Sequence, residues 1–204
     1  MYSIKFQTIS EHLAKGSRFI AVAARVETVE AFTSLYLQTK SLYPSATHYC
    51  YAYIIGDNQE HQKASDDGEP AKTAGQPLLE AIKKKNLTDV ALIVVRYFGG
   101  TKLGTGGLIR AYGQAGREAL DDAQIIPKLD LDSIEISFGY EYQSSIDHFL
   151  QENAKVITKE FTEKVSYIIS SEHKHTVEII SALTNMTKGE ITPRIISSTK
   201  TYNQ

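Results

Sequence analysis

Glycines and cations cluster in the segment RYFGGTKLGTGG, residues 96–107, directly after an apolar run. A glycine lets the backbone take positive φ and lets another surface approach, although it costs conformational entropy on folding. Where such a loop runs into a helix, free backbone N–H groups and the positive end of the helix dipole favour an anion. The segment therefore predicts an anion-binding loop with Arg96 and Lys102 as flanking cations.

The two common phosphate-binding patterns do not fit this segment. The Walker pattern requires a lysine after its second glycine, but Thr105 and Gly106 follow Gly104. The dinucleotide pattern requires a third glycine where Ile109 stands. Two interpretations remain open for the loop: an anion site made by the backbone, or a tight turn with close packing of the helix on the sheet.

A second polar segment, SDDGEPAKTAGQP at residues 65–77, carries three carboxylates, Asp66, Asp67 and Glu69. Carboxylate oxygens are the ligands that Mg²⁺ prefers. Asp-Gly is equally a turn signal, and the residue before a proline is restricted to extended backbone. The turn interpretation is favoured, and the magnesium interpretation is kept as its alternative.

The remaining reactive side chains do not make a site. His48 and Cys50 share one strand face, but two ligands do not make a zinc site, and the pair His173 and His175 has the same weakness. Cys50 lies among apolar aromatic residues that disfavour a thiolate. No nucleophile elbow and no His-Glu-x-x-His pattern occurs. We expect no catalytic residue, no metal and no cofactor.

Composition excludes several classes of protein. The net charge of −2 excludes a strongly polybasic chain, but residues 1–129 hold 15 Lys and Arg against 13 Asp and Glu, a balance of +2. Residues 130–204 hold 7 against 11, so the first part is the better candidate for a polyanion. One cysteine and no apolar stretch near 20 residues favour a cytoplasmic protein without a membrane partner.

Periodicity predicts the elements that would position these residues. Residues 2–6 alternate as a strand, residues 90–95 are apolar throughout as in a strand buried on both faces, and a helix starts near Thr105. The other elements expected before residue 129 are strands at 18–26 and 48–56 and helices from Thr28 and from Thr73.

Beyond Pro127 the pattern changes to strand, helix, strand, strand, helix, strand, the ferredoxin-like βαββαβ order. The expected strands are residues 131–138, 156–161, 165–170 and 191–197, with helices between the first two and the last two. The prediction is an α+β protein of two domains, 1–129 and 130–204.

The two polar segments together resemble the IMPACT/YigZ family. SDDGEPAKTAGQPLL is followed about twenty residues later by VVRYFGGTKLGTGGLIRAY, and KGSRF and ATH look like further motifs of that family. The resemblance implies an N-terminal domain with the fold of the second domain of a ribosomal small-subunit protein and of domain IV of elongation factor G. It also implies a ferredoxin-like C-terminal domain similar to those of elongation factors.

The resemblance further implies an association with translation regulation. Eukaryotic members interfere with activation of the kinase that senses amino-acid starvation, nucleic-acid binding has been proposed for bacterial members, and no settled enzymatic activity is part of the family's description. If the acidic segment and the glycine loop meet, Asp66, Asp67 and Glu69 would form ion pairs with Arg18, Arg96 or Lys102 and hold the loop in place.

Three functions follow as hypotheses. The leading one is a non-enzymatic module that binds RNA, the ribosome or another translation partner, without DNA specificity. Its cations would be Arg18, Arg96, Lys102 and Arg110, and the glycines allowing close approach would be Gly99, Gly100, Gly104, Gly106 and Gly107. The alternatives are an enzyme or binding protein for a phosphorylated ligand, using the glycine loop and the acidic turn, and a protein-interaction regulator without nucleic acid. The sequence gives no oligomeric state.

Overall fold

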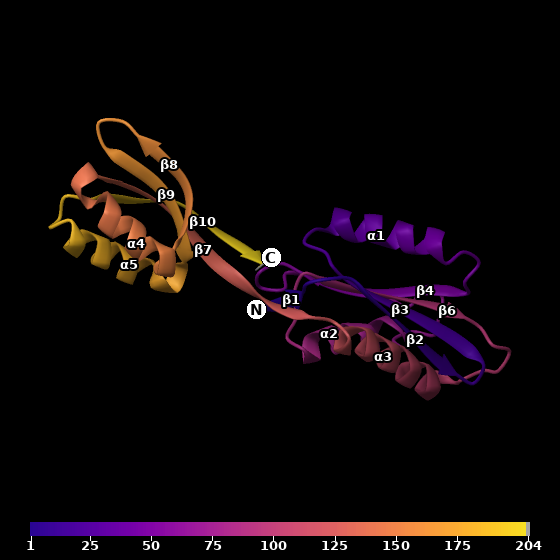
Figure 1. The fold of residues 1–204 in the computed structure, drawn as a ribbon. Coiled ribbons are helices and arrows are strands. Elements are labelled where there is room, and N and C mark those ends of the chain that lie inside the picture. Colours follow the sequence, from indigo (N-terminus) through magenta and orange to yellow (C-terminus); the bar gives the residue numbers. More distant parts are fainter. Residues whose placement is uncertain (203–204) are drawn as a thin grey trace. The chain divides into compact units, whose positions relative to one another are not determined.

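The computed structural model describes residues 1–202, and its fold is a mixed α+β architecture (Figure 1). The chain divides into two compact units between Pro127 and Lys128. Each unit has its own sheet and its own apolar core. Within residues 1–202, no helix combines the length and apolar character needed to cross a bilayer.

The N-terminal unit is an antiparallel sheet between two helical layers. Its strand order is β2-β3-β6-β4-β5. Figure 1 shows one helix, α1, on one face of this sheet and two helices, α2 and α3, on the other. The elements are β1 (Tyr2–Ile4), β2 (Thr8–Ala14), β3 (Ser17–Arg25), α1 (Val29–Leu42), β4 (His48–Ile55), β5 (His61–Ser65), α2 (Gly75–Lys84), β6 (Val90–Tyr97) and α3 (Thr105–Asp121).

Residues 90–95 of β6 are all apolar because both faces of the strand are covered. Leu92 and Val94 lie in the core beneath α2 and α3, and Ile93 lies in the cluster around Phe32 of α1. Fully burying each such side chain stabilises the fold by about 1.5–3 kcal/mol. The central strand is therefore fixed from both sides, and the residues at its end are placed on a rigid support.

The strand predicted at residues 2–6 is shorter than expected, and the next strand, β2, was missed. β1 ends at Ile4, and β2 then pairs with β3. In β2 the polar side chains face helix α3, since Thr8 Oγ1 donates to Ala119 O of that helix at 2.6 Å. Leu13 is exposed instead. This inverted alternation hides the strand from an analysis that expects apolar residues to face the core.

The C-terminal unit follows the predicted order of strand, helix, strand, strand, helix, strand. Its sheet has β7 and β9 in the centre, β8 beside β9 and β10 beside β7. Apolar side chains such as Ile136, Leu150 and Tyr167 join the sheet to the two long helices. The elements are β7 (Ile125–Phe138), a short 3₁₀ helix (Tyr140–Tyr142), α4 (Gln143–Asn153), β8 (Lys155–Phe161), β9 (Val165–Glu172), α5 (His173–Met186) and β10 (Thr192–Tyr202).

Strand β7 begins six residues earlier than the sequence predicts, at Ile125 rather than residue 131. Pro127 and the polar residues after it predict a domain boundary. In the structure Pro127 pairs with Tyr2 of β1, and Lys128 pairs with Tyr202 of β10. The expected boundary at residue 129 therefore falls inside a continuous strand, where pairing on each side satisfies the backbone.

Candidate functional site

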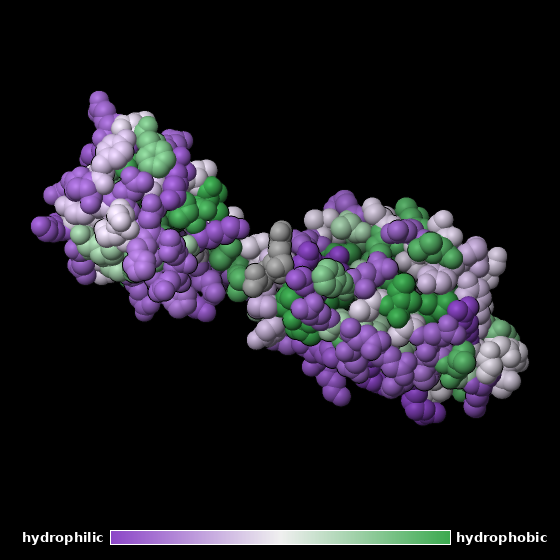
Figure 2. Space-filling model, viewed as in Figure 1, coloured by the Kyte–Doolittle hydropathy of each residue, from purple (hydrophilic) through white to green (hydrophobic). Residues whose placement is uncertain are grey.

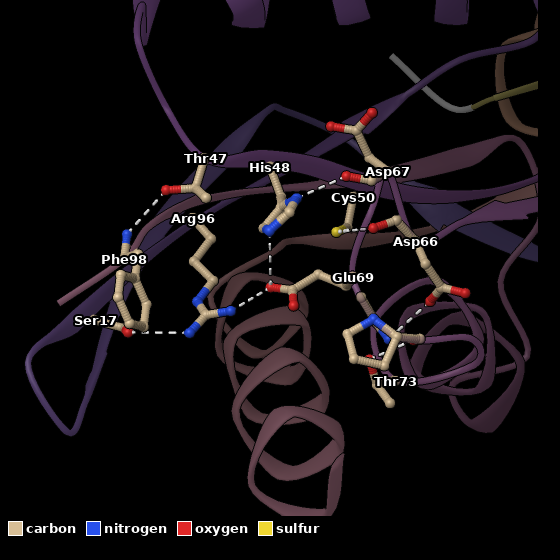
Figure 3. A network of polar contacts seen from close by, with 12 residues as sticks. Ser17, Thr47, His48, Cys50, Asp66, Asp67, Glu69, Thr73, Arg96 and Phe98 are labelled. Atoms are coloured by element: carbon tan, nitrogen blue, oxygen red, sulfur yellow. Dashed lines mark hydrogen bonds and ion pairs between the residues drawn. The ribbon is translucent and has the colours of Figure 1, made fainter. Parts of the chain in front are cut away.

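Five segments meet at one end of the N-terminal sheet, and they bring the two polar motifs together (Figure 3). Register places Arg96, near the end of β6, opposite both Phe19 of β3 and His48 of β4. The turn after β5 supplies Glu69, and α3 supplies Tyr112. Because side chains alternate along a strand, Arg96 and His48 point to the face covered by α2 and α3.

A buried ion pair lies at the centre of this site. Arg96 is 5% exposed and Glu69 is 8% exposed. Arg96 Nη1 donates to Glu69 Oε1 at 2.5 Å, and Tyr112 Oη donates to the same oxygen at 2.7 Å. Arg96 Nη2 donates to Ser17 Oγ at 3.3 Å. The pair therefore links the acidic turn to the strand that leads into the glycine loop.

Two further side chains close the network. His48 Nδ1 lies 2.7 Å from the carbonyl oxygen of Asp67, so this nitrogen carries the proton and donates. Its Nε2 lies 3.9 Å from Glu69 Oε1. Cys50 Sγ lies 3.0 Å from Asp66 O, and burial raises the pKa of this thiol. Burial also raises the pKa of the Tyr112 phenol, so neither group supplies an anionic nucleophile.

The two aspartates of the acidic turn accept hydrogen bonds from the backbone. Asp66 Oδ1 accepts from the N–H groups of Ala74 and Gly75, both at 2.9 Å, and so caps the start of α2. Asp67 Oδ2 accepts from Tyr49 N at 2.6 Å. Burial would raise the pKa of Asp66, but its backbone hydrogen bonds outweigh burial and lower it. Both oxygens of Asp66 accept backbone hydrogen bonds, since Oδ2 accepts from Lys72 N at 2.7 Å, so the turn interpretation accounts for this carboxylate.

The sequence left two interpretations open for the glycines, and both apply, to different residues. Gly99 serves close packing: a Cβ there would lie 1.9 Å from the backbone carbon of Gly16. Its N–H donates to Ser17 Oγ at 3.2 Å. Gly104 instead takes φ +75° and precedes α3 with no side-chain cap. Its neighbours Thr105 and Gly106 are exposed, so the first N–H groups of α3 are accessible.

Two cavities flank the start of α3 and share Leu103 in their linings. The loop cavity, about 360 Å³, lies against Phe98, Lys102 and Gly104 on the side of the buried ion pair. The helix groove, about 370 Å³, runs toward β2. Its cationic lining residues are Lys15, Arg110 and Arg117. Figure 2 shows hydrophilic residues predominating along the lower edge of this unit, where Figure 1 places α2 and α3.

Two of the four predicted phosphate contacts are placed differently from the expectation. Arg96 is buried in its ion pair, so it supports the loop instead of presenting a free charge. Arg18 points to the opposite face of the sheet, because neighbouring residues of β3 alternate, and it pairs with Glu11 at 2.8 Å. Lys102 and Arg110 are exposed and border the two cavities. Of the expected ion pairs, the site holds Glu69 with Arg96.

The structure adds two cations that the sequence analysis did not select, Lys15 and Arg117. The two residues are far apart in the sequence. Lys15 lies in the turn from β2 to β3, and Arg117 lies on α3 three turns after its start. With Lys102 and Arg110 they form the basic surface, four exposed side chains beside and along α3. None of the four forms an ion pair with another residue in the described part of the chain.

Several known proteins are similar to this chain in sequence. The family model described as the Impact N-terminal domain matches residues 15–120, more than half of the chain. The IMPACT family member YvyE of Bacillus subtilis (strain 168) is 36% identical over 190 residues, covering 93% of this chain and 88% of that protein. YigZ of Escherichia coli (strain K12) is 32% identical over 187 residues, covering 90% and 91%.

More distant relatives and a solved structure are also similar. The protein IMPACT homolog of Saccharomyces cerevisiae (strain ATCC 204508 / S288c) is 38% identical over 95 residues, covering 44% of this chain and 36% of that protein. A crystal structure titled as that of a hypothetical protein is 29% identical, with a TM-score of 0.66, covering 96% of this chain and 97% of its own. The match to the family model includes the turn before β3, the acidic turn and the glycine loop. This chain belongs to the IMPACT family.

Proposed function

We propose that the N-terminal unit is a non-enzymatic module that binds RNA of the translation machinery. The main supporting observation is the start of α3, which is exposed, has no side-chain cap and lies at one end of the basic surface, next to Lys102. Backbone N–H groups at a helix start attract phosphate, and nearby lysine and arginine side chains add attraction that does not depend on base sequence.

The buried network gives the proposal its rigid support. Glu69 and Arg96 join the turn after β5 to the end of β6, and Ser17 Oγ accepts from both Arg96 and Gly99. The loop before α3 is therefore fastened at its first residues while its last residues stay exposed. A preformed backbone site loses less entropy on binding than a flexible one.

The family resemblance supplies the rest of the proposal. It associates such proteins with translation regulation, and it relates the first domain, residues 1–129, to a ribosomal-protein domain and to domain IV of elongation factor G. It relates the second domain, residues 130–204, to ferredoxin-like domains of elongation factors. We propose these relationships as the reason that the partner is ribosomal or another structured RNA.

Equilibrium binding to a fluorescent, structured RNA tests the proposal. Affinity should fall steeply as salt rises, since each phosphate contact releases counterions. Replacing one contributing cation, as in Arg110→Gln or Lys15→Gln, should weaken binding and lower the salt slope by about 1. Lys84→Gln, on the exposed end of α2, is the matched control and should change neither.

Two results would count against an RNA function. One is an affinity for RNA that is indifferent both to salt and to the four cations. The other is a partner captured from a nuclease-treated lysate that binds through the same cations, because a partner that survives digestion of RNA points to protein recognition instead.

A further inference from the structure

We infer that the loop cavity holds one unpaired nucleotide of the bound RNA, with its base against Phe98 and a neighbouring phosphate at the start of α3. This inference rests on the proposed function, because the same helix start serves as the phosphate site in both. It goes further by naming single-stranded RNA, and not the shape of a duplex, as what the cavity recognises.

Phe98 provides a surface for a base to stack on. The residue is 48% exposed, and it directly follows the central strand β6. The residue is held from two sides, since its N–H donates to Thr47 Oγ1 at 3.1 Å and the Arg96 guanidinium lies 5.5 Å from its ring centroid. An aromatic ring that is fixed and still half exposed can stack any base.

The buried pair behind Phe98 is left with polar atoms that a ligand would satisfy. Arg96 lines the loop cavity, and its Nε is buried without a hydrogen-bond partner in the described structure. A buried donor without a partner is costly. Glu69 also lines the cavity, and Figure 3 shows the bond from Arg96 reaching one of its oxygens. Tyr112 donates to the same oxygen, Oε1, so Oε2 takes part in neither bond. A carboxylate oxygen accepts well from the amino group of adenine or cytosine.

The volume of the loop cavity and the charge at its rim limit which ligands it can hold. At about 360 Å³ the loop cavity is near the small end of ligand pockets, which run from about 300 to 1,000 Å³, so it suits one nucleotide and not a longer stacked segment. Lys102 and Gly104 at its rim place a cation and the helix start beside the base site. Leu103 separates the loop cavity from the helix groove, whose cations would contact the phosphates of the following nucleotides.

Paired measurements on single-stranded and duplex RNA test the inference with the full chain. The probes are a labelled oligoadenylate of about twelve nucleotides, long enough for one binding site, and an RNA duplex of the same length. Phe98→Leu should weaken oligoadenylate binding about tenfold and leave duplex binding unchanged, because stacking is lost but phosphate contacts remain. Phe6→Leu, at a phenylalanine that is 63% exposed and lies outside the cavity, should change neither.

A fluorescent adenine analogue placed once in the oligonucleotide gives an independent readout. Its emission should be quenched on binding to the natural chain and should recover in Phe98→Leu, while thermal melting shows that the variant is folded. If Phe98→Leu leaves both affinities and the quenching unchanged while Arg110→Gln weakens both RNAs, the nucleotide pocket is wrong and the RNA module stands. If neither RNA binds the natural chain, the proposed function fails and the pocket with it.

Discussion

At the scale of single residues, the Glu69 carboxylate is the group that joins the acidic turn to β6 and α3. It accepts from Arg96 and Tyr112 on the same oxygen. Glu69→Gln keeps the shape of the side chain but leaves the Arg96 guanidinium buried without a counter-charge. Removing one partner of a buried pair costs about 3–5 kcal/mol, so we expect a loss of that size in the free energy of unfolding, measured by urea denaturation.

The exposed pair between Arg18 and Glu11 is the matched comparison for this prediction. Its side chains lie 2.8 Å apart, but both are about half exposed. Water screens such a pair, so Glu11→Gln should leave the unfolding midpoint close to that of the natural chain. Equal losses in the two variants would show that burial of Arg96 does not set the cost.

Asp66 makes a prediction about pH. Its pKa is lowered from the ordinary value of 3.8, because backbone N–H groups outweigh the opposing effect of burial. A group with a lowered folded pKa stabilises the fold above its unfolded pKa and loses that contribution as pH falls through the folded pKa. Asp66→Asn should therefore cost about 1 kcal/mol at pH 7, because an amide nitrogen cannot accept the hydrogen bond that Lys72 N donates to Oδ2 at 2.7 Å. The difference from the natural chain should close as pH falls below about 4.

Urea unfolding of both chains at neutral and acidic pH measures this difference. Other carboxylates titrate equally in both chains, so they cancel in the comparison. A gap that keeps its full size at acidic pH would mean that shape, and not the charge on Asp66, caps α2.

Residue types predicted the cluster but not the role of each member. The sequence identified the acidic turn and the glycine loop, and it expected ion pairs between them. It could not tell that Arg96 is buried and Arg18 is on the other face, because those facts depend on register across β3, β4 and β6. Lys15 and Arg117 lie outside both motifs, and only the packing of α3 beside β2 brings them together.

At the scale of elements, the loop between β6 and α3 has a fastened half around Gly99, which packs against Gly16, and an open half at Gly104, which is exposed. Gly99→Ala would force a Cβ into the backbone of Gly16, while Gly106→Ala would meet only Arg110 Nη1 at 3.6 Å. Overpacking of this kind costs about 1–3 kcal/mol. We expect Gly99→Ala to lower the melting temperature and Gly106→Ala to leave it unchanged or raise it, since alanine favours helix over glycine.

Thermal melting followed by circular dichroism compares the two glycine variants directly. Similar losses in both would show that the loop has no fastened half. An unchanged Gly99→Ala would mean that the turn at Gly16 can move away without cost, and the packing argument for this glycine would then fail.

Helices and strands whose apolar residues recur at a regular spacing were predictable from the sequence. Elements stabilised by contacts with distant parts of the chain were not. The buried run of β6 and the apolar stripe of α3 follow from burial on a sheet. β2 turns its polar side chains toward α3, where Ser10 Oγ donates to Ala115 O at 3.3 Å, so its pattern inverts the usual one. β5 is polar on both faces and is held as a strand by pairing with β4, which a single segment of sequence does not show.

At the scale of the whole chain, the division into two units separates charge as well as cores. Residues 1–127 hold 14 Lys and Arg against 13 Asp and Glu, whereas residues 128–204 hold 8 against 11. The basic surface and both cavities beside α3 belong to the first unit. Under the proposed function, the second unit contributes little to the electrostatic attraction of RNA.

A chain ending at Pro127 tests whether the first unit carries the RNA activity alone. It keeps the three residues of β7 that pair with β1 and all of its own core, so we expect it to fold with the helix signal of α1, α2 and α3. Its RNA affinity and salt slope should match those of the full chain within about threefold, which is under 1 kcal/mol. The complementary chain from Lys128 should bind the same RNA at least about tenfold more weakly, since its net charge is negative. A folded first unit that loses RNA binding, or a second unit that retains it, would move the binding surface away from the start of α3.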